Sequence, residues 1–371
     1  MKKSHAQDRL ESILSKAQSG RMLFKEDIVF LLGIRDESQI QALFKTARAL
    51  RTRYFGHKVF LYGFVYISTF CRNDCKFCFF SRSNLDSRRY RKNPSEIIEA
   101  SCRLADSGVH LIDLTMGEDP EFFLRGKNGF NDLVALVSSV KSATGLPIMI
   151  SPGVVPDHVL ENLAETGTTW YACYQETHRP DLFKQLRIKQ CFTERLEKKR
   201  LAHQLGMFIE EGLICGIGET SEDIADSFEV IRLLDTDQMR VMSFVPQKGT
   251  PMADSIPPDP RREYLITAVM RLSFPDRLIP ASLDVGGLSG LKHRLDAGAN
   301  VVTSLVPPGQ GLSGVAQNAL DIEDGRRTSS SLQPVLDVCG LRTASIDDYL
   351  GWISNRREKL VQKDIEREIA C

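Results

Sequence analysis

The chain has 371 residues, of which 42% are hydrophobic and 26% charged, so it can bury one large core or two ordinary ones. Its 48 Lys and Arg residues equal its 48 Asp and Glu residues, which excludes a bulk positive field that would attract nucleic acid or an anionic membrane. The N-terminus lacks an apolar segment of signal-peptide length, and no segment is long enough to span a membrane. We therefore expect a cytoplasmic protein with neither nucleic acid nor a membrane as a partner.

The pattern of apolar residues along the chain predicts a barrel. Residues 1–56 have helical spacing and are expected to form an N-terminal helical region. Eight β-type runs follow, at 59–69, 110–115, 146–151, 170–176, 207–218, 240–246, 277–284 and 300–306. Most intervals between these runs have amphipathic helical spacing; in the first of them, Ser95 is the expected N-cap.

This alternation predicts parallel strands with helices outside, and eight strands are the number that closes a (β/α)8 barrel of the TIM type. We expect the barrel to occupy residues 57–345 and a C-terminal tail, helical or partly disordered, to occupy 346–371. A doubly wound open sheet is the alternative. In a barrel, chemistry gathers at the carboxyl ends of the strands. Polar and Gly-rich segments follow each predicted strand, at 71–78, 113–120, 151–153, 174–178, 216–219, 244–251, 282–284 and 307–311.

Three cysteines follow the first predicted strand in the pattern C-x3-C-x2-C: Cys71, Cys75 and Cys78. Thiolates are soft ligands that suit zinc or an iron–sulfur cluster. Structural zinc is nearly always closed by four protein ligands, but the nearest histidines, His57 and His110, lie outside the loop and no second C-x2-C pair exists. The pattern favours a [4Fe–4S] cluster with one iron left open, and zinc or three buried structural thiols are the alternatives.

The remaining cysteines are scattered singly, and each is expected to be a small core residue or a free thiol. They are Cys102, Cys173, Cys191, Cys215, Cys339 and Cys371.

The cysteine motif, with Phe77 before its last cysteine, resembles that of the radical S-adenosylmethionine (SAM) superfamily. Further segments between about residues 25 and 345, such as "DLTMGEDP", "LPIMISPG", "YQETH" and "RVMSFVPQKGTP", resemble the 3-methylornithine synthase family, whose relatives are biotin synthase and the hydrogenase maturase. The resemblance implies two cofactors, a [4Fe–4S] cluster and SAM. In this family the open iron chelates SAM, and reductive cleavage of SAM gives a 5′-deoxyadenosyl radical.

The activity that the resemblance implies is isomerisation of L-lysine to (3R)-3-methyl-D-ornithine, by fragmentation and recombination of the carbon skeleton, as the first step of pyrrolysine biosynthesis. No catalytic group beyond the cofactor radical is expected, and the partner is a low-potential electron donor such as flavodoxin or ferredoxin. The alternative is another radical SAM enzyme, similar to biotin synthase or the maturase, that acts on a different small molecule. No second cysteine group is present to hold a sacrificial cluster, which disfavours sulfur insertion.

The resemblance also assigns residues to SAM. "MGED" resembles the family's Gly-Gly-Glu segment, which holds the ammonium of SAM, and Met116 stands where the first glycine is usual. Without the resemblance, "MGED" is interpreted as a turn, and Arg187 and Arg195 as surface cations. The expected SAM-binding positions are Phe77, Met116, Gly117, Glu118, Ser151, Glu176, Arg187, Arg195, Ile217 and Gly218.

Lysine carries two ammonium groups and one carboxylate, so its pocket needs both signs of charge. We expect Arg240 to bind the carboxylate, Asp113 and Asp284 the ammonium groups, and Ser282 to add a hydrogen bond. Alternatively, Asp113 pairs with a lysine or arginine of the barrel, and Arg240 either caps the sixth predicted strand or pairs with Asp237.

Overall fold

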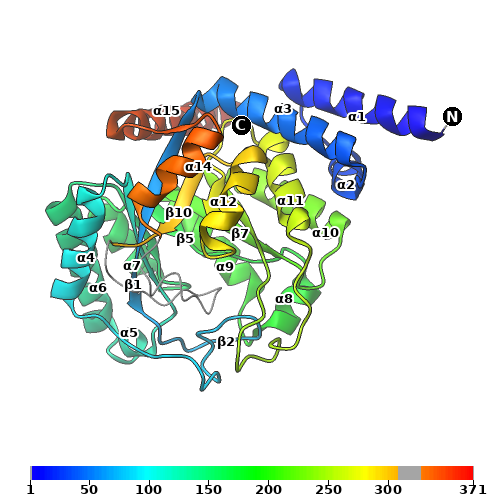
Figure 1. Cartoon of the computed structure of the whole chain (residues 1–371). Helices are drawn as coiled ribbons and strands as arrows, with labels where there is room; N and C mark the ends of the chain where they lie inside the picture. The colour runs from blue at the N-terminus through cyan, green and yellow to red at the C-terminus, as the bar shows by residue number, and fades with distance from the viewer. Residues whose placement is uncertain (1, 308–326, 371) are drawn as a thin grey trace.

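Eight parallel strands form a barrel at the centre of the computed structural model, which describes residues 2–307 and 327–370 (Figure 1). The strands are β1 (Lys58–Ser68), β3 (Leu111–Met116), β4 (Ile148–Ser151), β5 (Trp170–Ala172), β7 (Phe208–Cys215), β8 (Gln238–Ser243), β9 (Pro280–Ser282) and β10 (Val301–Leu305). Their order around the sheet is β8-β7-β5-β4-β3-β1-β10-β9. Within the described ranges, a single bridge from Gln238 to Leu278 joins β8 to the segment before β9, so the barrel is nearly closed. The predicted barrel is confirmed, and each predicted strand has its counterpart.

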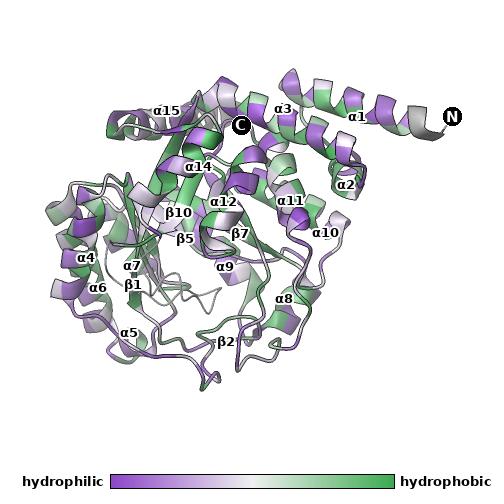
Figure 2. Cartoon of the chain, in the orientation of Figure 1, coloured by the Kyte–Doolittle hydropathy of each residue, from purple (hydrophilic) through white to green (hydrophobic). Residues whose placement is uncertain are grey.

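Helices surround the strands and bury their apolar sides against them, as the hydropathy colouring shows (Figure 2). The helices of this layer are α4 (Pro94–Asp106), α5 (Pro120–Leu124), α6 (Lys127–Thr144), α7 (Asp157–Glu165), α8 (Pro180–Leu186), α9 (Phe192–Gln204), α10 (Ser221–Leu233), α11 (Pro260–Ser273), α12 (Gly287–Asp296) and α14 (Gln333–Val338), which a 3-10 turn, η1 (Ser329–Leu332), precedes.

The expected cap of α4 was wrong. Asn93 caps the helix and forms a capping box with Glu96, and Ser95 lies within the first turn. Pro94 explains the difference: its fixed φ and missing N–H suit the first helical position, which places the cap one residue before it.

The N-terminal helices and the last helix lie at one end of the barrel, opposite β2 (Asp74–Cys75) (Figure 1). They are α1 (Lys2–Gln18), α2 (Lys25–Gly33), α3 (Glu37–Phe55) and α15 (Ile346–Ala370), the last following β11 (Arg342–Thr343), which pairs with β1. The first turns of α15 fill the base of the barrel: the hydroxyl oxygens of Tyr62 and Tyr349 are 2.8 Å apart, and the rings of Trp170 and Trp352 stack at 5.9 Å. The tail is thus helical to residue 370, and Cys371 lies outside the described residues.

The opposite end of the barrel carries the loops. There β2 pairs antiparallel with β6 (Arg187–Ile188), which places Cys75 directly opposite Arg187. The loop segment 307–311 that was predicted after the last strand lies, apart from its first residue, outside the described residues. In the part of the chain that the structure describes, no helix is long and apolar enough to cross a membrane.

Candidate active site

The three clustered cysteines line one cavity of about 200 Å³ at the mouth of the barrel. Cys71 follows β1, Cys75 lies on β2, and Cys78 follows in the next turn, where its backbone N–H donates to the carbonyl of Cys75. The two histidines nearest in sequence are committed elsewhere. The ring of His110 accepts a hydrogen bond from the backbone N–H of Leu61 at Nδ1, and its Nε2 lies 3.0 Å from the carbonyl oxygen of Ala344. The Nδ1 atom of His57 lies 3.1 Å from the carbonyl oxygen of Gly340.

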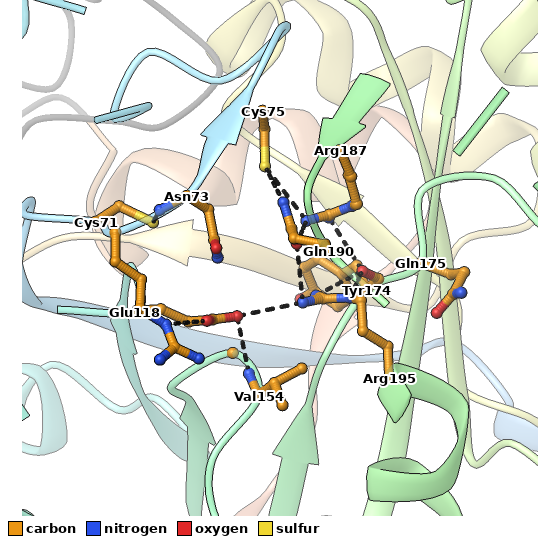
Figure 3. Close-up of polar contacts among 12 residues, drawn as sticks. Cys71, Asn73, Cys75, Glu118, Val154, Tyr174, Gln175, Arg187, Gln190 and Arg195 are labelled. Carbon is orange, nitrogen blue, oxygen red and sulfur yellow. Dashed lines mark hydrogen bonds and ion pairs between the residues drawn. The ribbon is translucent and has the colours of Figure 1, made fainter. Parts of the chain in front are cut away.

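The surroundings of the thiols fit an iron–sulfur cluster. Cys75 Sγ accepts a hydrogen bond from Gln190 Nε2 at 3.0 Å, and Cys71 Sγ accepts one from the backbone N–H of Asn73 at 3.5 Å (Figure 3). Gly117 packs closely against the cysteine loop, because a Cβ there would lie 2.7 Å from the carbonyl oxygen of Phe70 and 2.8 Å from Cys71 Cβ. Cysteine ligands with N–H donors aimed at sulfur are the usual setting of such clusters. No three His, Cys, Asp or Glu side chains among the described residues lie close enough to hold a single metal ion.

Glu118 is the acidic group of the site and lies beside the cysteine loop. Its carboxylate accepts hydrogen bonds from Arg72 Nε at 2.9 Å and from the backbone N–H of Val154 at 3.0 Å, and Arg195 Nη1 lies at 3.4 Å (Figure 3). Gly153, at φ +74°, packs against this carboxylate, and a Cβ there would lie 2.3 Å from Glu118 Cγ.

Two arginines, Arg187 and Arg195, supply positive charge to the cavity. Arg187 and Arg195 both donate to the carbonyl of Tyr174, at 3.0 and 2.8 Å, so the end of β5 fixes both guanidinium groups (Figure 3). Arg187 also pairs with Glu176 at 3.1 Å. Burial raises the pKa of Glu176, whose Oε2 is buried with no hydrogen-bond partner among the described residues. That oxygen is available to a ligand.

Eight of the ten residues expected to bind SAM line this cavity: Phe77, Met116, Gly117, Glu118, Ser151, Glu176, Arg187 and Arg195. Ile217 and Gly218 do not line it. Ile217 packs instead in an adjacent apolar cluster that includes Phe244 and, at its edge, Phe77.

The four residues expected to bind substrate lie deeper in the barrel and are all buried. Asp113 accepts a hydrogen bond from Ser151 at 3.1 Å, which links it to the cavity above. Burial raises the pKa of Asp113 to about 8, and nearby Glu210 adds to the effect. Arg240 does not pair with Asp237. Its Nε donates to Glu210 at 2.6 Å, whereas its Nη2 is buried without a partner among the described residues.

Asp284 has partners already. It accepts hydrogen bonds from Ser304 at 2.7 Å and Ser282 at 3.2 Å, and Arg327 Nη1 donates to it at 3.0 Å. The structure therefore brings Ser282 and Asp284 together, with a buried cation beside them.

Residues that the sequence reasoning missed support those that it found. They are Glu210 and Tyr174 around Arg240, Ser304 and Arg327 around Asp284, and Gln190 beside Cys75. One signal was present: "FIEEGLIC" places two consecutive acids in a buried strand, so one of them must face the barrel interior. That residue is Glu210.

The other acid, Glu211, faces the helix layer and stabilises the turn that carries Glu176. It forms an ion pair with Lys199, and His178 Nε2 lies at 3.3 Å. Its Oε1 accepts from the backbone N–H of Gln175 at 2.7 Å, next to Glu176, whose φ of +68° is in the left-handed region. The buried ion pair thus holds a strained residue in place.

The chain is similar to known proteins over most of its length. The profile of the Radical SAM superfamily matches residues 65–231. The chain is 40% identical over 344 residues to a 3-methylornithine synthase of Methanosarcina barkeri, which covers 93% of this chain and 97% of that protein. It is 30% identical to the [FeFe] hydrogenase maturase subunit HydE of Thermotoga maritima, over 78% of this chain and 82% of that one. The crystal structure of methylornithine synthase (PylB) superposes with a TM-score of 0.87 at 39% identity, covering 92% of this chain and 99% of that one.

Proposed function

The chain belongs to the 3-methylornithine synthase family of the radical SAM superfamily, and from this membership we propose a role for each group at the mouth of its barrel. The reaction is the isomerisation of L-lysine to (3R)-3-methyl-D-ornithine, the first step of pyrrolysine biosynthesis. When bound, the cluster and SAM supply the 5′-deoxyadenosyl radical that removes a hydrogen from the substrate. The side chains of the barrel bind and orient the cofactors and lysine, and enclose the lysine.

Cys71, Cys75 and Cys78 hold the cluster. The backbone of Met116 and Gly117 and the carboxylate of Glu118 receive the ammonium of SAM, and all three residues line the same cavity as the cysteines. Guanidinium groups bind carboxylates well, and Arg187 and Arg195, which the carbonyl of Tyr174 holds in place, bind the carboxylate of SAM. Glu176 Oε2, which has no hydrogen-bond partner among the described residues, accepts a hydrogen bond from a ribose hydroxyl, and Ser151, which lines the same cavity, contributes to binding the ribose. Ile217 and Gly218, which lie next to the cavity, flank the adenine.

The observation that carries the substrate assignment is that Arg240 Nη2 is buried and has no hydrogen-bond partner among the described residues. A buried cationic donor without an acceptor is costly, so this edge of the guanidinium calls for an anionic ligand. Glu210 holds the other edge and thereby fixes the direction in which Arg240 presents its free N–H. The carboxylate of lysine fits there, Asp113 and Asp284 accept its ammonium groups, and Ser282 adds a hydrogen bond.

A dry, fixed pocket serves the chemistry. A carbon radical reacts with the nearest hydrogen, so orientation of lysine decides which one is removed, and fragments must stay enclosed until they recombine. Binding lysine at both ends, by Arg240 and by the aspartates, meets both needs.

The electron donor is a low-potential protein such as flavodoxin or ferredoxin. Residues 71–92, which include the cysteine loop, carry seven Lys and Arg residues against two Asp in a chain whose total charge is balanced. Three of these cations form ion pairs: Arg72 with Glu118, Arg82 with Asp74 and Arg91 with Asp119. The exposed Arg88 and the half-buried Lys76 and Lys92 supply the positive charge that attracts an acidic electron carrier to the end of the barrel that bears the cysteines.

The test is anaerobic incubation of reconstituted protein with SAM, a reductant and isotopically labelled L-lysine. A product of unchanged mass and altered chromatographic retention supports the assignment. Sulfur incorporation, or turnover of another small molecule in place of lysine, would overturn it. Arg240→Gln should abolish lysine turnover while SAM still binds, and Arg232→Gln, on the outer helix α10, is the matched control.

A further inference from the structure

Gln190 lies between a cysteine of the motif and the two arginines of the cavity (Figure 3). Its Nε2 is 3.0 Å from Cys75 Sγ, and its Oε1 accepts hydrogen bonds from Arg187 Nη1 at 3.2 Å and Arg195 Nη1 at 3.5 Å. Sequence reasoning did not single this residue out, and the roles proposed above do not use it.

The surroundings fix which way the amide points. Rotating it by half a turn would aim its N–H₂ group at two guanidinium groups, which can only donate, and its oxygen at a sulfur that carries negative charge when it binds metal. Both contacts would then be repulsive. The arginines therefore force the donor end of Gln190 toward Cys75.

The backbone holds the side chain within reach of the sulfur. Cys75 and Arg187 are paired across β2 and β6, and the N–H of Gln190 closes a turn onto the carbonyl of Arg187 at 3.2 Å. Lys189, within that turn, has φ +59°, and α9 begins two residues after Gln190. The distance from amide to thiol thus depends on a fixed ribbon and not on a free loop.

We propose that Gln190 raises the reduction potential of the cluster that Cys75 helps to hold, by donating this hydrogen bond to the sulfur; the inference rests on the proposed function. A reduced cluster carries one more negative charge than an oxidised one, so an N–H donor at a ligating sulfur stabilises the reduced form more. Electron entry then becomes easier. Gln190 also lines a second cavity, of about 310 Å³, together with Arg72 and Lys189.

Gln190→Leu is the test variant, because leucine fills a similar volume and keeps water from replacing the lost donor. Gln190→Glu keeps an oxygen for the arginines and places an acceptor against the sulfur. Gln185→Leu is the control, since Gln185 is exposed on α8 nearby. The midpoint potential is measured by electron paramagnetic resonance during a potentiometric titration of reconstituted protein without SAM. We expect the ratio of reduced to oxidised cluster at a fixed potential to be about tenfold lower in the leucine variant, which equals a fall in midpoint potential of about 59 mV for one electron. The midpoint potential of Gln190→Glu should be lower still, and that of Gln185→Leu should equal the wild-type value.

Protein labelled with ¹⁵N in the glutamine side chain gives a second readout. A weak nitrogen coupling to the reduced cluster is expected in the wild type and the Gln185 variant, and should vanish in both Gln190 variants. An unchanged potential in Gln190→Leu, at wild-type iron and sulfide content, would overturn the proposal, as would a change confined to SAM affinity through the arginines. If the leucine variant retains no cluster, the potential of Gln190→Glu decides. If the wild type itself takes up no cluster, the proposed function fails, and this is seen before any potential is measured.

Discussion

Lysine binding should strengthen as the pH rises toward 8, because Asp113 must lose a proton before it can pair with a substrate ammonium. Burial raises the pKa of Asp113 to about 8, with Glu210 adding to the shift and Arg240 and the Ser151 hydroxyl opposing it. For such a group roughly one carboxyl in eleven is ionised at pH 7, and the unfavourable deprotonation costs about 1.4 kcal/mol there. Between pH 6 and pH 8 the dissociation constant should fall roughly fiftyfold.

The assay is anaerobic titration calorimetry with L-lysine on cluster-loaded, SAM-saturated protein between pH 6 and 8.5, in buffers of different ionisation enthalpy. About 0.9 proton should be released per lysine bound at pH 7. Asp113→Asn should abolish both the proton release and the pH slope, and should weaken binding at pH 8 about a hundredfold or more, since a buried charge loses its partner. Glu210→Gln should lower the pKa of Asp113 by removing the neighbouring negative charge, so lysine affinity should increase at a lower pH than in the wild type. A flat profile in the wild type, or the same slope in Asp113→Asn, would refute this reasoning.

Two further changes test the support of the site. Gly153→Ala should lower SAM affinity about tenfold or more with the cluster content unchanged, because the added methyl group meets Glu118 and the backbone is left-handed; calorimetry measures it. Lys199→Met should reduce the free energy of unfolding by about 3–5 kcal/mol at neutral pH, because buried Glu211 loses its lysine partner; urea denaturation measures it. Burial raises the pKa of Glu211, but Lys199 and His178 together outweigh this and hold the pKa below its usual value. In the wild type the stability contributed by this pair is therefore present above about pH 4.5 and lost as the pH falls further.

Controls separate these outcomes from general damage. Gly145→Ala is the match for Gly153, because it too is left-handed, at φ +66°, but its Cβ would meet nothing within 4 Å. Lys198→Met is the match for Lys199, since its ion pair with Asp157 is at the surface and is worth about 1 kcal/mol or less. Equal effects in either pair would contradict the structural argument.

The sequence predicted the barrel because a buried parallel strand needs a continuous apolar run, and eight such runs are visible without any knowledge of contacts. The charges of lysine and the family resemblance led to the expectation that Arg240 and Asp113 bind the substrate, and the structure buries both side chains inside the barrel. It did not predict the partner of Arg240. Glu210 lies on another strand, and only the register Gly212↔Arg240 between β7 and β8 places the two side chains together.

Gln190 illustrates the same limit more strongly. It lies 115 residues after Cys75, and no local pattern distinguishes it from the exposed Gln185 on the helix before it. The two-residue ribbon of β2 and β6, too short to give a strand signal, creates the contact. The expected cap at Ser95 failed for a local reason: the proline before it was not given its preference for the first helical position.

The first strand of the barrel hydrogen-bonds to one of the last, and the base is sealed by a helix that begins at residue 346. A ribosome therefore releases the three thiols long before Arg187, Arg195 or the sealing helix exist to enclose them. During translation the three thiols are therefore exposed to oxidants and to other metal ions. Correct maturation of the enzyme depends on protection of the nascent chain in the cell.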